Sequence, residues 1–301
     1  MIAVSINQGI GNQMFQYAFA FALSKKGHKV YVDTHSYAPN TSMTCETTSI
    51  RSIFPNLSLK ETPRYRFLFL FRKFGKTKYQ RYLKAYLRKY FSKLKIETYI
   101  DEPSYGYCPN VFSQITKNCI FYGLWQSDKY FAEYESDLRQ QYVFPSFTEE
   151  LNIRTATLMS QTNSIAIHIR KGIDYQKSEL LSNGGCNLEY YKNAIRYIND
   201  HVENPVYYIF TDNQDWVEKN ITFINYTIIN WNPVDGNMNY RDMQLMTYAK
   251  HVVIANSSYS WWGAWLNNNR NKIVIAPKLF HFPIDDFFKR SDIICNNWIT
   301  F

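Results

Sequence analysis

The chain has 301 residues, a length that suits two domains, and its 46% hydrophobic content is enough for a core in each. Five scattered cysteines without a CxxC pair predict a reducing compartment and exclude a disulfide framework and a cysteine-based zinc site. The N-terminus lacks the pattern of a signal peptide, and no segment approaches the roughly 20 apolar residues of a membrane span. We therefore expect a cytoplasmic protein.

The N-terminal part of the chain is predicted to begin with a β-α-β unit. A strand at residues 2–6 is followed by the polar glycine loop "NQGIGNQ", a helix at 14–27 and a second strand at 29–33. Further along, we expect a strand at 119–125 and a helix at 127–142. This order of elements is typical of an α/β domain.

The positive charge of the chain is concentrated between Arg64 and Lys95. This stretch contains twelve Lys or Arg residues and no Asp or Glu, and removing them from the formal charge of +9 leaves −3 for the rest of the chain. Its cations alternate with Tyr, Phe and Leu, which is typical of a helix that rests peripherally on an anionic membrane. One alternative is a solvated helical arm with an apolar inner face. A nucleic-acid surface is disfavoured, because no nucleic-acid motif accompanies the patch.

The C-terminal half alternates regularly between predicted strands and helices, as expected for a parallel sheet with helices on both faces. Residues 143–164 resemble a crossover between domains. We therefore predict an N-terminal α/β domain at 1–155, with the basic insertion at about 64–95, and a second α/β domain at 156–301 across a cleft. In the second half, the predicted strands are 164–169, 206–210, 227–229, 251–255 and 272–276, and the predicted helices are 187–200, 239–250 and 259–269.

The segment "SIAIHIR" alternates in a way that predicts one functional face. Ile165, Ile167 and Ile169 fall on one side of the strand, and His168 and Arg170 fall on the other. Ligands of open parallel sheets bind outside the carboxyl ends of the strands. The two polar side chains therefore lie where a ligand is expected.

Polar residues follow three of the predicted strands, and together they suit a nucleotide. The amino end of a helix has free N–H groups and a positive dipole that favour phosphate, and an arginine can hold two phosphate oxygens at once. Each residue alone has a structural explanation: the serines as a helix cap, the aspartate as a turn cap, the histidine as a satisfied strand residue. Their convergence on one sheet edge favours a binding site. The residues are His168, Arg170 and Lys171, then Asp212 and Asn213, then Asn256, Ser257 and Ser258.

A dinucleotide-binding fold is the main alternative for the first loop. The GxGxxG pattern needs glycine at position 14, which is Met14, although Asp33 ends the second strand where a ribose-binding acid is expected. We therefore disfavour a nicotinamide enzyme. The sequence has no DxD and no cluster of metal ligands, so we expect no metal, with Arg170 and Lys171 neutralising any leaving diphosphate.

Four stretches in this order resemble the inverting α-1,2-fucosyltransferases of glycosyltransferase family 11. They are "GIGNQMFQYAFAFAL" (9–23), "HIRKGIDY" (168–175), "YYIFTDNQDW" (207–216) and "DMQLMTYAKHVVIANSSYSWWGAWL" (242–266). The last of these is the most specific. The resemblance spans most of the chain but leaves about 35–118 uncovered.

The resemblance implies a GT-B fold of two Rossmann-like domains, with the donor GDP-L-fucose held by the second and no metal in the chemistry. It also implies that the first domain, at 1–155, is the acceptor-side domain. Arg170 would meet the donor diphosphate, helped by Lys171 and by the "NSSY" segment from Asn256 to Tyr259, in which Ser257 and Ser258 approach phosphate. His168 and Asp212 would lie near guanine or ribose. Gln8, Asn12 and Gln13 of the first loop would face the cleft near fucose and acceptor, and we predict Arg170, Asn12 and Gln13 as the catalytic residues.

The chain departs from the family's HxRRGDY pattern. Lys171 replaces the second arginine and keeps the charge without the bidentate geometry, and Ile173 separates Gly172 from Asp174. Asn213 stands where the family commonly has a second acid, so it cannot act as a base. The sequence identifies no base, and we hypothesise a loose, oxocarbenium-like transition state in which Arg170 stabilises the leaving group and proton removal is late.

Three functions follow from these observations. The first is α-1,2-fucosyl transfer from GDP-L-fucose to the O2 of a galactose-terminated glycan acceptor, in bacterial surface polysaccharide synthesis on a lipid carrier at the inner membrane. The second is a related transfer from another GDP-sugar. The third is a non-catalytic module that binds a nucleotide or a glycan. The first is favoured because the "GIGNQMFQYA" and "NSSYSWWGAWL" segments occur together.

Overall fold

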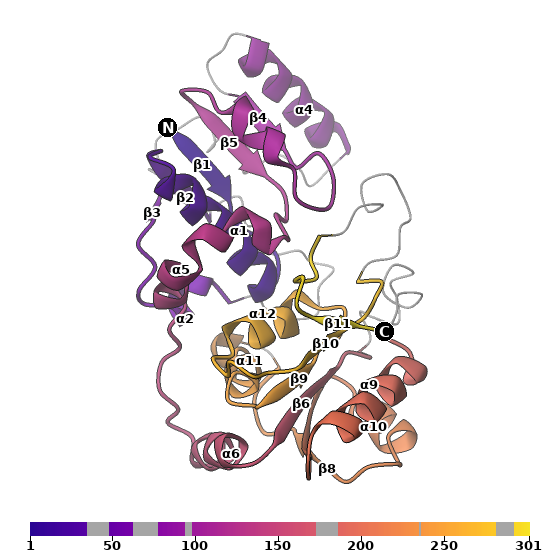
Figure 1. Cartoon of the computed structure of the whole chain (residues 1–301). Coiled ribbons are helices and arrows are strands. Elements are labelled where there is room, and N and C mark those ends of the chain that lie inside the picture. The colour runs from indigo at the N-terminus through magenta and orange to yellow at the C-terminus, as the bar shows by residue number, and fades with distance from the viewer. Residues whose placement is uncertain (35–47, 63–77, 94–97, 173–185, 235, 281–291) are drawn as a thin grey trace.

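The computed structural model contains two parallel sheets, one in each half of the chain (Figure 1). The structure describes residues 1–34, 48–62, 78–93, 98–172, 186–234, 236–280 and 292–301. No helix in these ranges is long and apolar enough to cross a membrane.

The first sheet has the strand order β3-β2-β1-β5-β4 and is parallel throughout. Helix α1 is buried along most of its length and is largely apolar after its first two turns, because it lies between this sheet and helix α12 of the other half. The strands are β1 (Ile2–Ser5), β2 (Val30–Asp33), β3 (Lys60–Glu61), β4 (Thr98–Asp101) and β5 (Cys119–Tyr122). The helices are α1 (Ile10–Lys25), α2 (Ile50–Ile53), α4 (Lys78–Lys93), α5 (Glu135–Gln141) and the 3₁₀ turns η1 (Pro109–Gln114), η2 (Asp128–Tyr130) and η3 (Ala132–Tyr134).

The second sheet has the order β11-β10-β9-β6-β7-β8, also parallel. Parallel strands need crossover connections, and here helices supply them. The strands are β6 (Ser164–Ile169), β7 (Val206–Thr211), β8 (Tyr226–Ile229), β9 (His251–Val253), β10 (Val274–Ala276) and β11 (Ile299–Thr300). The helices are α6 (Glu150–Gln161), α9 (Leu188–His201), α10 (Gln214–Asn220), α11 (Arg241–Met246), α12 (Ser258–Leu266) and the 3₁₀ turn η4 (Gly236–Met238).

Two connecting segments differ from the sequence-based expectation. The helix expected at 127–142 is interrupted at Phe131, whose backbone (φ −131°, ψ 7°) leaves the helical region while its fully buried ring stacks on Trp262 at 5.7 Å. The crossover expected at 143–164 contains α6 at its C-terminal end, which contacts β6 and α11. Since α6 spans residue 155, we propose that the second domain begins with this helix.

The two halves share a continuous aromatic core. The ring of Phe15 on α1 lies 4.4 Å from that of Trp261 and 4.8 Å from that of Trp262 on α12. The Trp262 indole donates to the Gly11 carbonyl at 2.9 Å. A Cβ on Gly11 would lie 2.5 Å from the Ser258 carbonyl carbon, so only glycine permits this approach. The amino ends of α1 and α12 are thus held in direct contact.

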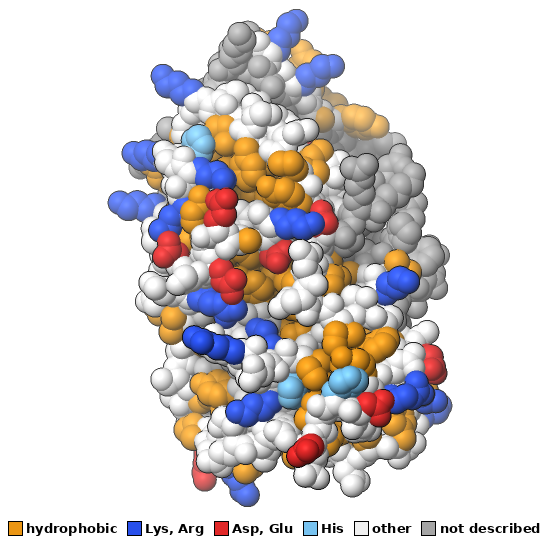
Figure 2. Space-filling view, viewed as in Figure 1, with side chains coloured by type: hydrophobic (Ala, Val, Ile, Leu, Met, Phe, Trp, Pro, Cys, Tyr) orange, Lys and Arg blue, Asp and Glu red, His pale blue; other side chains and the backbone are white. Residues whose placement is uncertain are grey.

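Charge is distributed unevenly on the surface. On the face drawn in Figure 2, Lys and Arg side chains project around the end of the molecule formed by the first sheet and α4. Exposed hydrophobic side chains lie between them.

Candidate active site

The carboxyl end of β6 forms the centre of the site. The three isoleucines of β6 pack on the α9 side of the sheet, in one core cluster with Tyr191, while Ala166 packs in the other cluster with Trp261. His168 is buried on the Ala166 side, and its ring centroid lies 5.9 Å from that of Tyr259. The alternation of "SIAIHIR" therefore separates a packing face from a polar face, as the sequence predicts.

Arg170 reaches the start of α12. Its Nη1 donates to the Ser257 hydroxyl at 3.4 Å. Ser257 occupies the N-cap position, but its side chain makes no capping hydrogen bond to α12. The hydroxyl is directed at the guanidinium, and the first N–H groups of a nine-residue helix lie beside the same arginine. A cation, a hydroxyl and a helix amino end thus converge as phosphate recognition requires.

Two buried side chains beside Arg170 keep polar atoms without a partner among the described residues. Asn256 is 2% exposed, and neither its Nδ2 nor its Oδ1 is hydrogen-bonded there. The Nδ1 of buried His168 has no partner there either. Buried polar groups are nearly always satisfied in folded proteins, so such atoms at a sheet edge indicate a ligand position. Burial and the Arg170 charge lower the pKa of His168 to about 3, so the imidazole is neutral near pH 7.

The end of β7 is tied to the end of β6. Asp212 accepts from the Lys171 N–H at 2.6 Å, and the Asn213 side chain donates to the Lys171 carbonyl at 2.9 Å. Asn213 also caps α10 by accepting from the Trp216 N–H at 3.0 Å. The Lys171 ammonium lies 5.3 Å from the centre of the Trp216 ring. Burial lowers the pKa of Lys171, while Cys186 and Asp212 oppose that shift. The two strand ends therefore form one rigid edge.

A shallow recess adjoins this edge on the α10 side. It has a volume of about 440 Å³ and is lined by Asn213, Asp215, Trp216, Lys219 and Asn220. An indole face with amide and charged groups around it suits a planar polar ring.

Asn12 reaches the same place from the other half of the molecule; it was expected in the first loop but lies in the first turn of α1, which begins at Ile10 rather than at residue 14. Asn12 Oδ1 accepts from the Ser258 hydroxyl at 2.8 Å and from the Gln126 amide at 2.6 Å, and Asn12 Nδ2 donates to Gln8 Oε1 at 2.7 Å. Gln8 itself adopts a left-handed backbone conformation with φ 68°. The structure thus joins Asn12 to the Ser257–Ser258 segment, which Arg170 also contacts.

Gln13 lies elsewhere. It is buried, and its amide donates to the carbonyls of Gln8 and Thr48 at 2.8 and 2.9 Å, while its oxygen accepts from the Ile50 N–H at 3.1 Å. These contacts fix the first loop against the 48–50 segment. The structure does not bring Gln13 to the Arg170 edge, and its side chain has the contacts of a positioning residue.

Tyr259 also points away from the Arg170 edge. Its hydroxyl donates to the Asn239 carbonyl at 2.7 Å and accepts from the Met243 N–H at 2.8 Å. Only the ring, beside His168, borders the site. Tyr259 therefore anchors α12 to α11.

Gln126 is a site residue that the sequence reasoning missed. It follows β5, whose neighbour in the sheet is β1, so the two carboxyl ends lie together. The preceding turn is held by Glu102, which accepts from the N–H groups of Leu124 and Trp125 at 2.7 and 3.1 Å and keeps Trp125 at φ 55°. Burial raises the pKa of Glu102 to about 7. The position of Gln126 after a predicted strand was the available signal.

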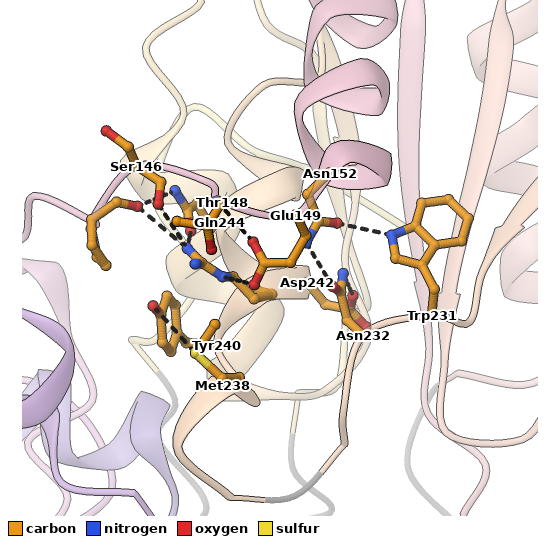
Figure 3. Close-up of polar contacts among 12 residues, drawn as sticks. Ser146, Thr148, Glu149, Asn152, Trp231, Asn232, Met238, Tyr240, Asp242 and Gln244 are labelled. Atoms are coloured by element: carbon orange, nitrogen blue, oxygen red, sulfur yellow. Dashed lines mark hydrogen bonds and ion pairs between the residues drawn. The ribbon is translucent and has the colours of Figure 1, made fainter.

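A polar network holds the connecting segment before α6 (Figure 3). Arg241 is 3% exposed and donates to Glu149 at 3.1 Å, to Gln244 at 2.8 Å and to the carbonyls of Pro145 and Ser146 at 3.3 and 3.5 Å. Gln244 also donates to the Pro145 carbonyl at 2.8 Å. The segment between the two sheets is thereby clamped onto α11.

The network continues toward α6. Asn152 accepts from the Trp231 indole at 2.9 Å and donates to Asn232 at 2.8 Å, and Asn232 donates to Asp242 at 2.8 Å. Burial raises the pKa of Asp242 to about 6. Because α11 supports Tyr259, the clamp and the site share one helix.

Three residues of the predicted motif, Ile173, Asp174 and Tyr175, lie outside the described residues. Within the described ranges, no group of three or more His, Cys, Asp or Glu side chains is placed to hold a metal ion.

The whole chain, residues 1–301, matches the model of glycosyl transferase family 11. The chain belongs to this family. Among family 11 relatives, an α-1,2-colitosyltransferase from Escherichia coli is 30% identical over 92% of this chain and 91% of its own. The O-antigen biosynthesis glycosyltransferase WbnK from Escherichia coli is 28% identical over 98% of both chains.

A solved structure supports the fold. Arabidopsis thaliana FUT1, in complex with GDP, matches 91% of this chain and 70% of its own with a TM-score of 0.51 and 12% identity. At this identity the match concerns the fold alone. Together with the two parallel sheets, it confirms the predicted GT-B architecture for this family 11 glycosyltransferase.

Proposed function

We propose that this family 11 enzyme transfers L-fucose from GDP-β-L-fucose to the O2 of a galactoside, with inversion and without a metal. The observation that carries the proposal is the convergence at the amino end of α12 of Arg170, Ser257 and the Asn256 amide, which has no partner among the described residues. This constellation supplies positive charge and hydrogen-bond donors for a diphosphate. The α-1,2 linkage follows the name of the colitosyltransferase relative.

In the proposed reaction, the acceptor hydroxyl attacks C1 of fucose opposite the diphosphate. The C1–O bond to the β-phosphate breaks as the new glycosidic bond forms, GDP departs with the electron pair, and the hydroxyl proton passes to a base or to water. Arg170 and the α12 amino end stabilise the negative charge that develops on the leaving oxygen. Preorganised charge of this kind replaces a metal ion.

Donor and acceptor meet between the two halves. Asn12 lies in hydrogen-bonding contact with Ser258, so a group placed against the α12 amino end also lies next to the first loop. We assign Asn12 to orienting the sugar or the acceptor, and Gln13 to positioning the loop that carries Asn12. On the donor side, we assign His168, Lys171 and Asp212 to the nucleoside and diphosphate, and Tyr259 to the support of α12.

A colitosyl donor is the second candidate, because a relative 30% identical to this chain carries that name. Colitose differs from L-fucose only in lacking the 3-hydroxyl. A site that hydrogen-bonds this hydroxyl rejects the deoxy analogue strongly, whereas an apolar site discriminates weakly. Turnover of the GDP forms of both sugars therefore decides between the donors.

The nucleotide specificity can be tested by calorimetric titration of GDP, UDP and ADP in the presence of EDTA. We expect GDP to bind at least about tenfold more tightly than the other two, a difference of about 1.4 kcal/mol. Equal affinity for the three nucleotides would contradict a GDP-sugar donor. GDP binding without turnover of any GDP-sugar would instead support a non-catalytic nucleotide-binding module.

A further inference from the structure

Helix α4 (Lys78–Lys93) exposes a row of tyrosines that packing does not explain. Tyr79, Tyr82, Tyr86 and Tyr90 are 77%, 67%, 66% and 49% exposed. Their spacing of three and four residues places them on one face of the helix. An isolated exposed tyrosine is ordinary, but four in a row along the length of one helix form a continuous amphipathic surface.

Two leucines beside the tyrosine row, on the flank of the same helix face, hold α4 to the protein. Leu83 and Leu87 are half-buried, and α4 contacts β4 at the edge of the first sheet. The helix is therefore anchored by leucines while its tyrosine row faces outward. The exposed tyrosine side chains can therefore meet a surface while the leucines keep α4 at the edge of the first sheet.

Charge indicates what that partner is. Six Lys or Arg residues and no acid occur in the sixteen residues of α4, and the stretch from Arg64 to Lys95 contains twelve cations and no acid. Lys89 and Lys93 are exposed on the helix. The rest of the chain carries −3, so the attraction to an anionic surface is confined to this end.

Tyrosine side chains favour the boundary between lipid headgroups and acyl chains, and lysines and arginines favour anionic headgroups. We propose that the tyrosine row of α4 docks this protein onto an anionic phospholipid bilayer. A helix of this length lies flat on a surface over about 24 Å. The inference does not depend on the donor or acceptor chosen above.

The test is cosedimentation of the full chain with vesicles of phosphatidylcholine alone and of phosphatidylcholine with phosphatidylglycerol. We expect at least about tenfold stronger binding to the anionic vesicles, falling as salt is raised. The variant Tyr79→Ser/Tyr82→Ser/Tyr86→Ser, which changes the three most exposed tyrosines of the row, should lose about tenfold or more of this binding. Circular dichroism and the thermal midpoint should stay close to those of the wild type, because these side chains are exposed.

A matched control is available on α6, at the far end of the molecule from α4 (Figure 1). Leu151 and Leu158 are 53% and 42% exposed, and the variant Leu151→Ser/Leu158→Ser should bind anionic vesicles like the wild type. A second variant, Lys89→Glu/Lys93→Glu, should weaken binding to anionic vesicles without affecting the neutral ones. Unchanged binding in the tyrosine variant overturns the proposal. Preferential binding of a single-stranded oligonucleotide over the vesicles also overturns it, since that result assigns the surface to nucleic acid.

Discussion

Asn12 and Ser258 are 246 positions apart in the chain, yet the Ser258 hydroxyl donates to the Asn12 side-chain oxygen at 2.8 Å. The contact joins the first loop of one half to the amino end of α12 in the other. Ser257, next to Ser258, receives a hydrogen bond from Arg170. Asn12 from one half of the chain and Arg170 from the other therefore contact neighbouring serines. The predictions below follow from this arrangement.

Substitution of Gly11 should disturb the contact between the halves. In Gly11→Ala the new Cβ would lie 2.5 Å from the Ser258 carbonyl carbon, so α1 and α12 must separate. Overpacking of this kind costs about 1–3 kcal/mol of stability, and we expect turnover to fall at least about tenfold. Gly9→Ala is the control, because no atom lies within 4 Å of its added Cβ. Equal turnover and equal urea midpoints for the two variants would show that the close approach is unimportant.

Asn12→Ala removes an oxygen that accepts from two side chains and an amide that donates to Gln8. We expect turnover to fall about 100-fold from misorientation, while the affinity for GDP stays within about twofold. Steady-state kinetics together with GDP titration separate the two effects. A loss of GDP affinity that matches the loss of turnover would place Asn12 in nucleotide binding instead.

Arg170→Ala should abolish most leaving-group stabilisation. Loss of one preorganised charged donor lowers turnover by about 100- to 1,000-fold, and Arg170→Lys should recover part of it by restoring charge without the planar fork. Arg196→Ala, an exposed arginine on α9, is the control and should be neutral. Near-normal turnover in Arg170→Ala, measured as GDP release, would refute the role assigned to this residue.

The neutral His168 predicts how stability depends on pH. Folding lowers the pKa of His168 from the usual 6.5 to about 3. The free energy of unfolding that depends on the neutral imidazole is therefore fully present above pH 6.5 and is lost as the pH falls below that value. Between pH 7 and 5 the wild type should lose about 2 kcal/mol more unfolding free energy than His168→Gln. Urea titrations at both values test this, with exposed His201→Gln as the control. Parallel losses in wild type and His168→Gln would mean that the imidazole titrates normally.

Arg241 should matter for stability rather than for chemistry. Arg241→Met removes the hydrogen bonds that Arg241 donates to Glu149, to Gln244 and to the carbonyls of Pro145 and Ser146, of which the Pro145 carbonyl keeps only its bond from Gln244. We expect a loss of about 3 kcal/mol in unfolding free energy, with Arg154→Ala on the exposed side of α6 as a neutral control. If chemical denaturation gives the same midpoint for both variants, the clamp does not hold the segment.

The long parallel strands were predictable from sequence, and the short edge strands were not. The isoleucines of "SIAIHI" and the apolar run "VYYIF" identify β6 and β7 because central parallel strands are rich in such residues. β3 is only Lys60–Glu61, and β11 only Ile299–Thr300, so neither carries a readable alternation. The break at Phe131 depends on the stacking of its ring on Trp262, a contact across the molecule.

The convergence of polar residues at one edge of the second sheet was predictable, because β6 lies between β9 and β7 and polar residues follow each of these strands. Their role in donor binding stays a prediction. The pairing of Asn12 with Ser258 could not be predicted, since no local pattern relates residues in different halves. The same holds for Gln126, which reaches Asn12 only because β5 lies beside β1. Gln13 is next to Asn12 in the first turn of α1, but successive helical residues point in different directions, and Gln13 is directed at the carbonyl of Thr48.

The most direct test of the central claim is GDP release from GDP-L-fucose in EDTA, with and without lactose, with the product linkage read by NMR. The account predicts release that rises with lactose and yields an α-1,2-fucosylated galactose. Release that requires added metal, or a fucosylated product with another linkage, would contradict it.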